Sequence, residues 1–288
     1  KFIHGLWDMG LDPGHSVRSL SQCVEEAGKD VTVDTSLLES RLVAGSGALL
    51  VELEQRLREH RDVRTFFNEK FQEQKRRHER YQEAAYNLEP NIKESPGGLR
   101  DLQMVLWLAR AAGLGTSWGA LAEAGIIATS EATDIAINER VLQDLRIRLH
   151  YLAGRREDRL VFDHQIEIAR QLKLRAKAAM APSDLLMRRY YLAAKAIWRF
   201  NQILLANLFD RVTPDAERRV QVIDDDFQVV NVNLEIRDEA LFEKQPGMIL
   251  EAFRRLQDHR KVAGLGPTTL RALSRALPRI GRTFRDNP

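Results

Sequence analysis

Apolar residues recur along most of the chain at intervals of three and four, the spacing that places side chains on one face of a helix. The pattern is strongest in Leu99–Ala112, Glu131–Ala153 and Asp184–Phe209, and Ala48–Leu57 repeats it over a shorter length. Asp62–Gln82 is highly charged with sparse apolar positions, so we expect a solvated helix that bridges two packed parts. The pattern as a whole predicts a mainly α protein.

Signals for β-strands are few. Gly14–Leu20 follows a turn tripeptide and is a short extended candidate, and we expect Thr35–Val43 to belong to the same small sheet. Asp226–Arg237 alternates apolar and polar residues with one slip near Asn231, which predicts a hairpin or a bulged strand pair. The strands at the start of the chain add a minor α/β piece to the predicted helices.

Two further helical segments follow the hairpin. Met248–His259 comes directly after a Pro-Gly break, and Thr268–Phe284 carries arginines at helical spacing. These arginines are Arg271, Arg275, Arg279 and Arg282, and Arg285 follows them. No aromatic residues alternate with them as base stacking would require, so we favour a linker helix over an RNA-binding helix.

Composition narrows the class of protein. The chain has 288 residues and a mass of 33.0 kDa, and its 44 Lys and Arg are nearly balanced by 41 Asp and Glu. A net charge of +3 gives no field that argues for nucleic acid as a partner. The single cysteine, Cys23, excludes a disulfide framework and fits the reducing cytoplasm. No apolar run approaches the roughly 20 residues of a membrane span, and no signal peptide or initiator methionine opens the chain, so we expect a fragment without a membrane partner.

The segment 86–101 holds the most informative chemistry. Pro90 excludes a helix interior there, and Ser95-Pro96-Gly97-Gly98 then turns sharply into the helix that begins at Leu99. Gly97 and Gly98 let the backbone approach another group closely, and free amides at a helix start attract anions. With Lys93 and Arg100 beside it, the turn could cradle a phosphate or an acidic surface. The alternative is a tight loop in which Arg100 pairs with a neighbouring carboxylate.

Several strings of residues resemble those of one enzyme family, the GlnD-type uridylyltransferases. Leu88-Glu89-Pro90-Asn91-Ile92-Lys93 and Pro96-Gly97-Gly98-Leu99-Arg100-Asp101, with Trp107 in the helix that follows, resemble the family's LEP-[DN]-IK and PGGLRD motifs. Further matches, in order along the chain, are Gly14-His15-Ser16-Val17-Arg18-Ser19, Asp30-Val31-Thr32-Val33, Leu38-Glu39-Ser40-Arg41-Leu42, Asp158-Arg159-Leu160-Val161-Phe162-Asp163 and Ile223-Asp224-Asp225-Asp226-Phe227. The resemblance therefore covers nearly the whole chain.

The resemblance implies a fold and a reaction. Such enzymes join a nucleotidyltransferase domain of the DNA polymerase beta type, a helical region, a metal-dependent HD phosphohydrolase domain and ACT sensor domains. The transferase half uses Mg²⁺ to move UMP from UTP to a tyrosine of the signalling protein PII, and the HD half removes it when glutamine is plentiful. We expect the rear part of the transferase α/β domain followed by a helical bundle extension, in the cytoplasm, with PII, UTP and the effector glutamine as partners of the parent enzyme.

The departures from the family pattern predict a division of the chain. No Gly-Ser turn with an Asp-x-Asp strand precedes Gly14, and no His-Asp pair marks a hydrolase, so we expect the fragment alone to be inactive. We interpret Asp224-Asp225-Asp226 as a solvated turn. The expected parts are the end of the nucleotidyltransferase domain (1–47), a helical uridylyltransferase-associated domain (48–222), a strand-containing segment and helix (223–266) and a linker helix toward an HD domain (267–288).

The resemblance also suggests site residues. Glu39 and Arg41, with Gly45 after them, resemble an Asp-x-Arg pair of related domains, so Glu39 is a candidate third carboxylate and metal ligand, and Arg41 a phosphate contact. An ordinary pair of exposed charges is the alternative. The nucleotide-binding candidates are His15, Ser16, Arg18, Arg41, Lys93, Gly97, Gly98 and Arg100. Asp101 is expected to cap the turn or to pair with Arg100 or Lys93.

One basic cluster and one alternative function remain. Arg146, Arg148, Arg155, Arg156 and Arg159 form the densest basic cluster, and the acidic residues between them favour a salt-bridged surface over a docking face for PII. As an alternative to part of an enzyme, the chain could be a non-catalytic helical module that docks PII or relays a signal between domains.

Overall fold

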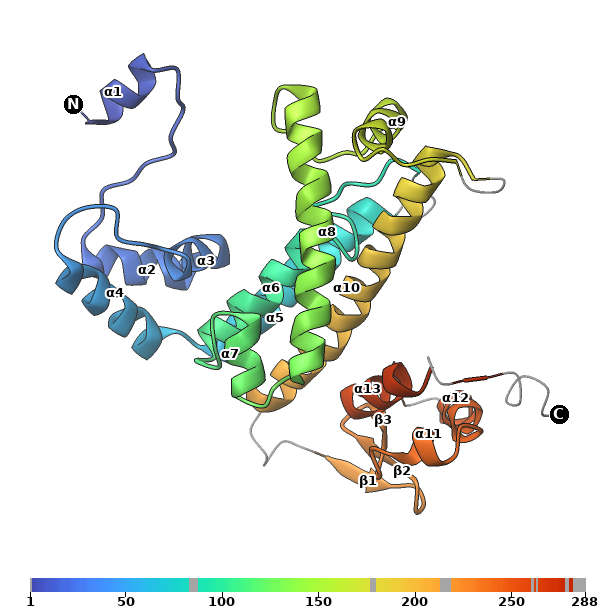
Figure 1. Cartoon of the computed structure of the whole chain (residues 1–288). Coiled ribbons are helices and arrows are strands. Elements are labelled where there is room, and N and C mark those ends of the chain that lie inside the picture. The colour runs from blue at the N-terminus through green and yellow to red at the C-terminus, as the bar shows by residue number, and fades with distance from the viewer. Residues whose placement is uncertain are drawn as a thin grey trace. The chain divides into compact units, whose positions relative to one another are not determined.

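The computed structural model describes residues 2–82, 88–176, 180–212, 219–259, 262, 264–277 and 280–281. Most of them lie in helices, which confirms a mainly α protein (Figure 1). The chain divides into two compact units, Lys1–Asp62 and Val63–Pro288, which are described separately below. Among the helices of the described residues, none combines the length and the apolarity needed to cross a membrane.

Every regular element of the first unit, over its described residues 2–62, is a helix. These helices are α1 (Phe2–Asp8), α2 (Leu20–Lys29), α3 (Val31–Leu38) and α4 (Gly47–His60). The prediction of strands at Gly14–Leu20 and Thr35–Val43 is therefore wrong, and the described residues of this unit contain no sheet.

Local side-chain chemistry explains where α2 and α3 begin. Ser19 closes a capping box, accepting from the Gln22 amide at 3.3 Å while its own amide donates to the Gln22 side chain at 2.8 Å. Asp30 caps the next helix by accepting from the Thr32 amide at 2.7 Å. These caps satisfy amides that a helix start leaves free, so they favour helices from Leu20 and Val31. The second helix takes up the first half of the strand expected at Thr35–Val43, whereas residues 14–19 are irregular.

The first unit is tied together by a buried ion pair. The Arg61 guanidinium holds the Asp34 carboxylate through two hydrogen bonds, with the one from Nε at 2.8 Å. Both side chains are less than a tenth exposed. A bidentate pair of this kind links α3 to the end of α4 in a fixed geometry.

The second unit begins with a helical bundle. Its helices are α5 (Val63–Gln82), α6 (Leu99–Ala111), α7 (Trp118–Glu123), α8 (Thr129–Ala153), α9 (Phe162–Gln171) and α10 (Pro182–Val212). The long α10 lies beside α6, α8 and α9, and its buried face supplies much of the core (Figure 1). All of the long predicted helices are confirmed, whereas the sequence reasoning missed α7 and α9.

The charged helix α5 is not a solvated bridge. It packs against α6 and α10, and Phe66 and Phe67 are buried. Two of its polar residues, Lys70 and Gln74, are buried as well. The expectation failed because the buried face of α5 is partly polar, and such a face looks solvent-exposed when only apolar positions are counted.

A small sheet follows the bundle. Its strands β1 (Val220–Val222), β2 (Phe227–Val230), β3 (Asn233–Ile236) and β4 (Gly264–Leu265) lie in that order. The predicted hairpin is confirmed: β2 and β3 are antiparallel, and Asn231 turns the chain with a φ of 58°. Asn tolerates this left-handed conformation better than most residues, which accounts for the slip in the alternation.

Three helices accompany the sheet: α11 (Leu241–Lys244), α12 (Met248–Asp258) and α13 (Pro267–Ala276). Phe227, Leu234 and Ile236 form the core with residues from all three helices, including Ala272 and Ala276 of α13. Of the predicted arginine series, Arg271 pairs with Glu131 at 3.3 Å and Arg275 with Glu239 at 3.3 Å. The other three, Arg279, Arg282 and Arg285, lie outside the described residues.

One buried carboxylate joins the sheet to α13. Glu235 of β3 accepts from the Thr269 amide and hydroxyl, both at 2.8 Å, and from the Thr268 amide at 3.2 Å. It therefore caps the first turn of α13, and a Cβ at Gly266 would lie only 2.3 Å from the carboxylate. Burial raises the pKa of Glu235 above its ordinary value, despite the lowering effect of these hydrogen bonds.

The raised pKa predicts how stability depends on pH. The folded state favours protonated Glu235. The stability that this residue contributes is therefore fully present below its unfolded pKa and is lost as pH rises through its folded pKa. Glu235→Gln keeps the group neutral at every pH. Urea unfolding between pH 4 and pH 8 should show the wild type losing stability relative to this variant as pH rises; a constant difference would contradict the assignment.

Candidate functional site

The turn before α6 folds by local hydrogen bonds. The Asn91 side-chain oxygen accepts from the amides of Lys93 at 3.0 Å and Glu94 at 2.8 Å, which bends the chain directly after Pro90. The Ser95 hydroxyl accepts from the Asn91 amide at 3.1 Å and closes the bend. Tyr86 and Asn87, which precede this string, lie outside the described residues.

The two glycines of the turn are required by close packing. Gly97 has a φ of 76°, and a Cβ there would lie 2.1 Å from the backbone oxygen of Ala194 in α10. A Cβ at Gly98 would lie 2.7 Å from the carbonyl oxygens of both Lys93 and Ser95. The close approach that the glycines allow is therefore to the backbone of α10 at Gly97 and to the carbonyls of the turn itself at Gly98.

The amides at the start of α6 all have partners within the protein. The Gly97 amide donates to the Asp101 carboxylate at 2.8 Å. The other four bonds are Gly98 to Ser95 O (2.7 Å), Leu99 to Ile92 O (3.1 Å), Arg100 to Lys93 O (2.9 Å) and Asp101 to Gly98 O (3.1 Å). Because these donors are already used, the side chains of Lys93 and Arg100 are what this turn can offer to a phosphate.

Asp101 is the centre of a buried polar network. Its fully buried carboxylate forms an ion pair with Arg77 and accepts from His78 at 2.8 Å and from Gln74 at 3.0 Å, all on α5. The Asn201 side chain of α10 donates to the Asp101 carbonyl at 3.0 Å and accepts from Gln74 at 2.8 Å. Asp101 caps the turn, as expected, but it pairs with α5 rather than with Arg100 or Lys93.

The network keeps Asp101 ionised. Burial alone would raise the pKa of Asp101, but the hydrogen bond and charge of His78 and the charge of Arg77 outweigh it and lower the pKa below its ordinary value. Arg77 Nε remains buried without a hydrogen bond among the described residues. Removing the carboxylate would therefore leave a buried guanidinium poorly compensated.

The Glu94 carboxylate lies among three cations beside the turn. Its carboxylate lies 3.1 Å from Lys93 Nζ, 3.4 Å from Arg100 and 3.9 Å from Arg77. These cations, together with a hydrogen bond from Lys93, overcome the effect of burial and lower the pKa of Glu94. The pairing of Arg100 with a neighbouring carboxylate, the alternative stated from the sequence, is thus what the structure contains.

The Trp107 ring contacts one of these cations, Arg100, and a lysine of α5. Lys70 Nζ lies 4.5 Å from the centre of its ring and the Arg100 guanidinium lies 5.2 Å from it. Cations held over an indole face in this way gain cation–π attraction. Of the cations of the turn, Arg100 is therefore ordered by both Glu94 and the Trp107 ring.

Two of the family-like strings pair with each other. The Ile92 amide donates to the Asp158 carbonyl at 2.8 Å, and the Leu160 amide donates to the Pro90 carbonyl at 2.9 Å. Glu89 forms an ion pair with Arg159 at 3.0 Å on the same side. The segment 88–93 and the segment 158–163 therefore form one structural element, although the bonded residues are 66 to 70 positions apart in the sequence.

The basic cluster is salt-bridged, as expected. Asp158 pairs with Arg146 at 2.5 Å and with His150 at 3.2 Å, and these contacts, with the charge of Lys93, outweigh burial and lower the pKa of Asp158. Arg155 pairs with Glu157 at 2.9 Å. The acidic run 224–226 also matches its interpretation as a turn, since Asp224 accepts from the amides of residues 226 and 227.

The other candidates lie in the first unit. Glu39 follows the last turn of α3, and Arg41 lies in the irregular segment after it; both are exposed. His15 contacts the Trp7 ring edge-on, with 5.6 Å between ring centres, and Ser16 and Arg18 are exposed. Nowhere in the described ranges do three or more His, Cys, Asp or Glu side chains gather as they would to hold a metal ion. The roles of these residues stay predictions.

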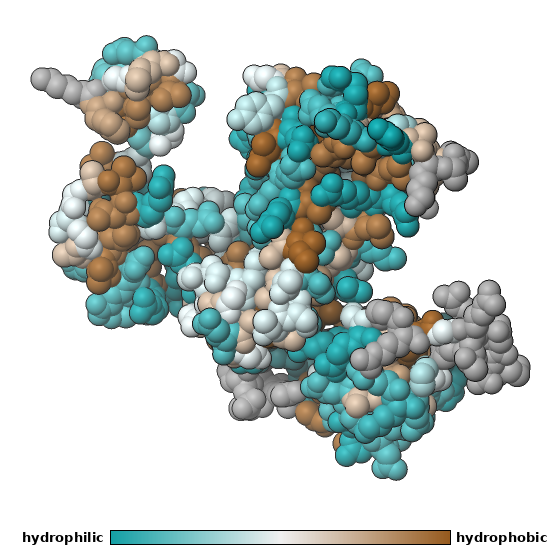
Figure 2. Space-filling view, in the orientation of Figure 1, coloured by the Kyte–Doolittle hydropathy of each residue, from teal (hydrophilic) through white to brown (hydrophobic). Residues whose placement is uncertain are grey.

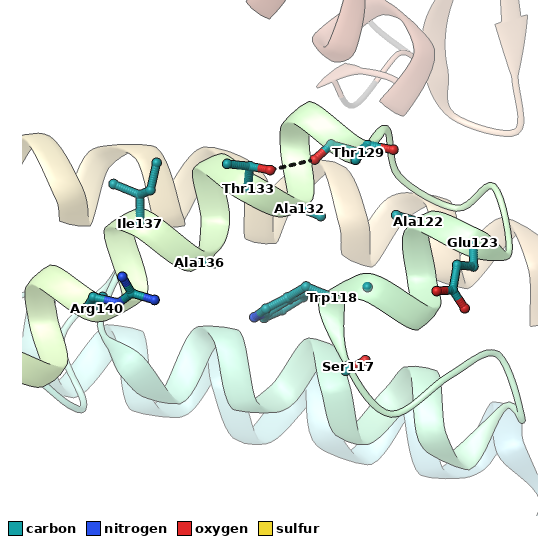
Figure 3. Close-up of a pocket in the computed structure, with 11 residues that line it drawn as sticks. Ser117, Trp118, Ala122, Glu123, Thr129, Ala132, Thr133, Ala136, Ile137 and Arg140 are labelled. Carbon is teal, nitrogen blue, oxygen red and sulfur yellow. Dashed lines mark hydrogen bonds between the residues drawn. The ribbon is translucent and has the colours of Figure 1, made fainter.

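A groove between α7 and α8 gave no signal in the sequence. It has a volume of about 750 Å³, and Figure 3 shows Trp118 pointing into it between Glu123 and Arg140. Small side chains, including Ala132 and Ala136, line its α8 side. Sequence reasoning missed it because α7 has only six residues and its place against α8 is a tertiary contact.

The glycine packing can be tested by a matched pair of variants. Gly97→Ala adds a methyl group that meets the Ala194 backbone at a positive φ, whereas Gly113→Ala meets no atom within 4 Å at a similar φ of 70°. We expect Gly113→Ala to lower the free energy of unfolding by about 1 kcal/mol and Gly97→Ala by several times as much. Equal losses in urea unfolding would show that the contact with α10 is unimportant.

The Asp101 network predicts a second effect on stability. Asp101→Asn should lower the free energy of unfolding at pH 7 by about 3–5 kcal/mol, because buried Arg77 loses its counter-charge. The lowered pKa means that the wild-type advantage is present above the unfolded pKa and lost as pH falls through the folded pKa. The difference in the free energy of unfolding between the wild type and Asp101→Asn should therefore be smaller below pH 4 than at pH 7. An equal difference at the two pH values would contradict the prediction.

Comparisons with known proteins place the chain among relatives. Residues 65–205 match the family described as GlnD PII-uridylyltransferase, and residues 227–288 match the uridylyltransferase GlnD third domain. The bifunctional uridylyltransferase/uridylyl-removing enzyme of Nitrosospira multiformis is 50% identical over 98% of this chain and 32% of its own length. That of Chromobacterium violaceum is 47% identical over 100% of this chain and 34% of its own length. No solved structure matches.

The chain thus spans about a third of the length of the curated relatives it matches. The family match covers most of the second unit, including the Asp101 network and the paired strings. On these residues and relatives, the chain belongs to the GlnD uridylyltransferase family.

Proposed function

We propose that this chain is part of a cytoplasmic enzyme that transfers UMP from UTP to a tyrosine of PII and also removes it, with glutamine as its effector. The observation that carries the proposal is the joining of two GlnD-like strings, 88–101 and 158–163, into one folded element. In this element Glu94 pairs with both Lys93 and Arg100, and Arg100 also lies over the Trp107 ring. The relatives' names support transfer and removal of a uridylyl group.

In the transfer, the tyrosine oxygen attacks the α-phosphorus of UTP. An O–P bond forms, the bond between the α-phosphorus and the bridging oxygen breaks, pyrophosphate leaves and the phenolic proton is released. Charge builds on the phosphate oxygens, so positioned cations accelerate the step. Lys93 and Arg100 suit this role because Glu94 orients both, and their side chains keep 13% and 24% of their surface exposed.

Magnesium is the expected metal of the reaction, and Glu39 is its candidate ligand in this chain. Mg²⁺ prefers six oxygen ligands, several of them water or phosphate oxygens. Glu39 is one exposed carboxylate outside any three-residue cluster of the described part, so it does not form a magnesium site by itself. No step of the transfer is therefore assigned to it.

The proposal predicts a change in UTP use. Lys93→Gln in the full-length enzyme should raise KM for UTP or lower kcat/KM about tenfold or more, because a hydrogen bond to a charged group contributes about 1.5–3 kcal/mol. Lys244→Gln on α11 is the matched control, since this lysine also pairs with a carboxylate, Asp238 at 2.7 Å, but belongs to the sheet and its helices. Transfer is measured with labelled UTP and purified PII.

The possible outcomes test the proposed activity and the role of Lys93 separately. Transfer by the wild type with unchanged kinetics in Lys93→Gln would keep the enzyme and reject Lys93 as a nucleotide contact. No transfer to PII by the wild type would reject the proposed function. Binding of PII without any effect of UTP would favour the alternative, a helical module that docks PII or relays a signal between domains.

A further inference from the structure

The outer face of α8 carries an unusual stripe of residues. Figure 1 shows the helix along its full length, and Figure 2 shows apolar and polar side chains intermixed on this side of the second unit. The core face of α8 is formed by Ile135, Leu142, Leu145 and Leu149. Directly opposite, alternating steps of four and three residues lead from Thr133 through Ile137, Arg140, Asp144 and Ile147 to Tyr151.

The apolar members of this outer stripe are well exposed. Ile137 is 55% exposed, Ile147 is 56% exposed and Tyr151 is 85% exposed. Single exposed apolar residues are common on protein surfaces and need no explanation. Three of them at the spacing of a coiled-coil seam, on one helix, form a surface on which a second helix can pack.

The order of residues in the stripe is self-complementary. When two copies of α8 run antiparallel about a two-fold axis near position 142, Arg140 of each copy faces Asp144 of the other. The same register sets Ile137 against Ile147 and Thr133 against Tyr151. A two-fold interface joins one surface to itself with each contact made twice, so this symmetry is what a second copy of the chain requires.

The charges fit the same register. Arg140 is exposed and makes no hydrogen bond or ion pair within the described part of the chain. Asp144 pairs with Arg148 at 3.1 Å but is still 37% exposed, so it can accept from a second guanidinium. Two Arg–Asp pairs per dimer would set both the register and the antiparallel direction, since a parallel pairing places like charges together.

The groove between α7 and α8 completes the fit. Thr133, Ile137 and Arg140 line both the groove and the stripe, and Figure 3 shows them along the helix beside Trp118. In the antiparallel register, Tyr151 of the second copy lies next to Thr133 and the small side chains of Ala132 and Ala136. An exposed aromatic ring on one copy thus faces an open groove of about 750 Å³ on the other.

We propose that α8 is a self-association surface, on which a second copy of this chain packs antiparallel with Arg140 against Asp144 and Tyr151 in the α7–α8 groove. The paired stretch from Thr133 to Tyr151 is about 27 Å long. A single helix pair is smaller than a standard stable interface, so the dimer forms reversibly with concentration. This proposal is independent of the proposed reaction.

Charge reversal tests the register directly. Arg140→Asp and Asp144→Arg each place like charges together twice in a dimer, so each should weaken dimerisation about 100-fold. A mixture of the two variants should dimerise again, because each carboxylate at position 140 or 144 then faces a guanidinium. Sedimentation of the chain over a range of concentrations measures the association, and circular dichroism checks the fold.

A matched control is Arg189→Asp on α10, an exposed arginine that makes the same charge change away from the stripe. It should dimerise like the wild type, and Tyr151→Ala should dimerise more weakly than both. A wild type that stays monomeric at high concentration overturns the proposal. So does a dimer that survives the single reversals, or one that the mixture fails to restore, since either result places the interface elsewhere.

Discussion

The ion pair between Asp101 and Arg77 is the contact on which the second unit depends. One buried carboxylate holds α5 through three side chains, closes the glycine turn through the Gly97 amide and lies beside Asn201 of α10. A buried charge is tolerated only when its partners compensate for lost water. The network therefore fixes the positions of α5, α6 and α10 together.

The same network explains what the residues of the PGGLRD string do in the fold. The glycines allow α10 to approach the turn, and the aspartate joins that turn to α5. The preceding LEPNIK string is held by the segment 158–163, which follows α8. The amides and the aspartate are used in folding. Lys93 and Arg100 are the cations that this element has left to offer, and Glu94 orders both.

Sequence patterns located the elements well where local chemistry decides. The long helices and the hairpin at Asn231 follow from periodicity and turn residues. The strands expected in the first unit failed because short segments such as Thr35–Val43 lack a decisive period, and the caps at Ser19 and Asp30 were overlooked. The charged helix α5 was misjudged for a related reason: its buried face is partly polar, and its partners lie on other helices.

The sequence by itself determined the family, the mainly α class and the residues Lys93 and Arg100 as neighbours of a sharp turn. Only the tertiary structure decided that Gly97 faces Ala194, that Asp101 pairs with Arg77 and His78, and that α7 and α8 enclose a groove. Caps, turns and helical faces depend on residues within about four positions, which a single sequence displays. The contacts of Asp101 with α5 and α10 join residues 23 to 100 positions apart, and their pairing depends on how whole helices pack.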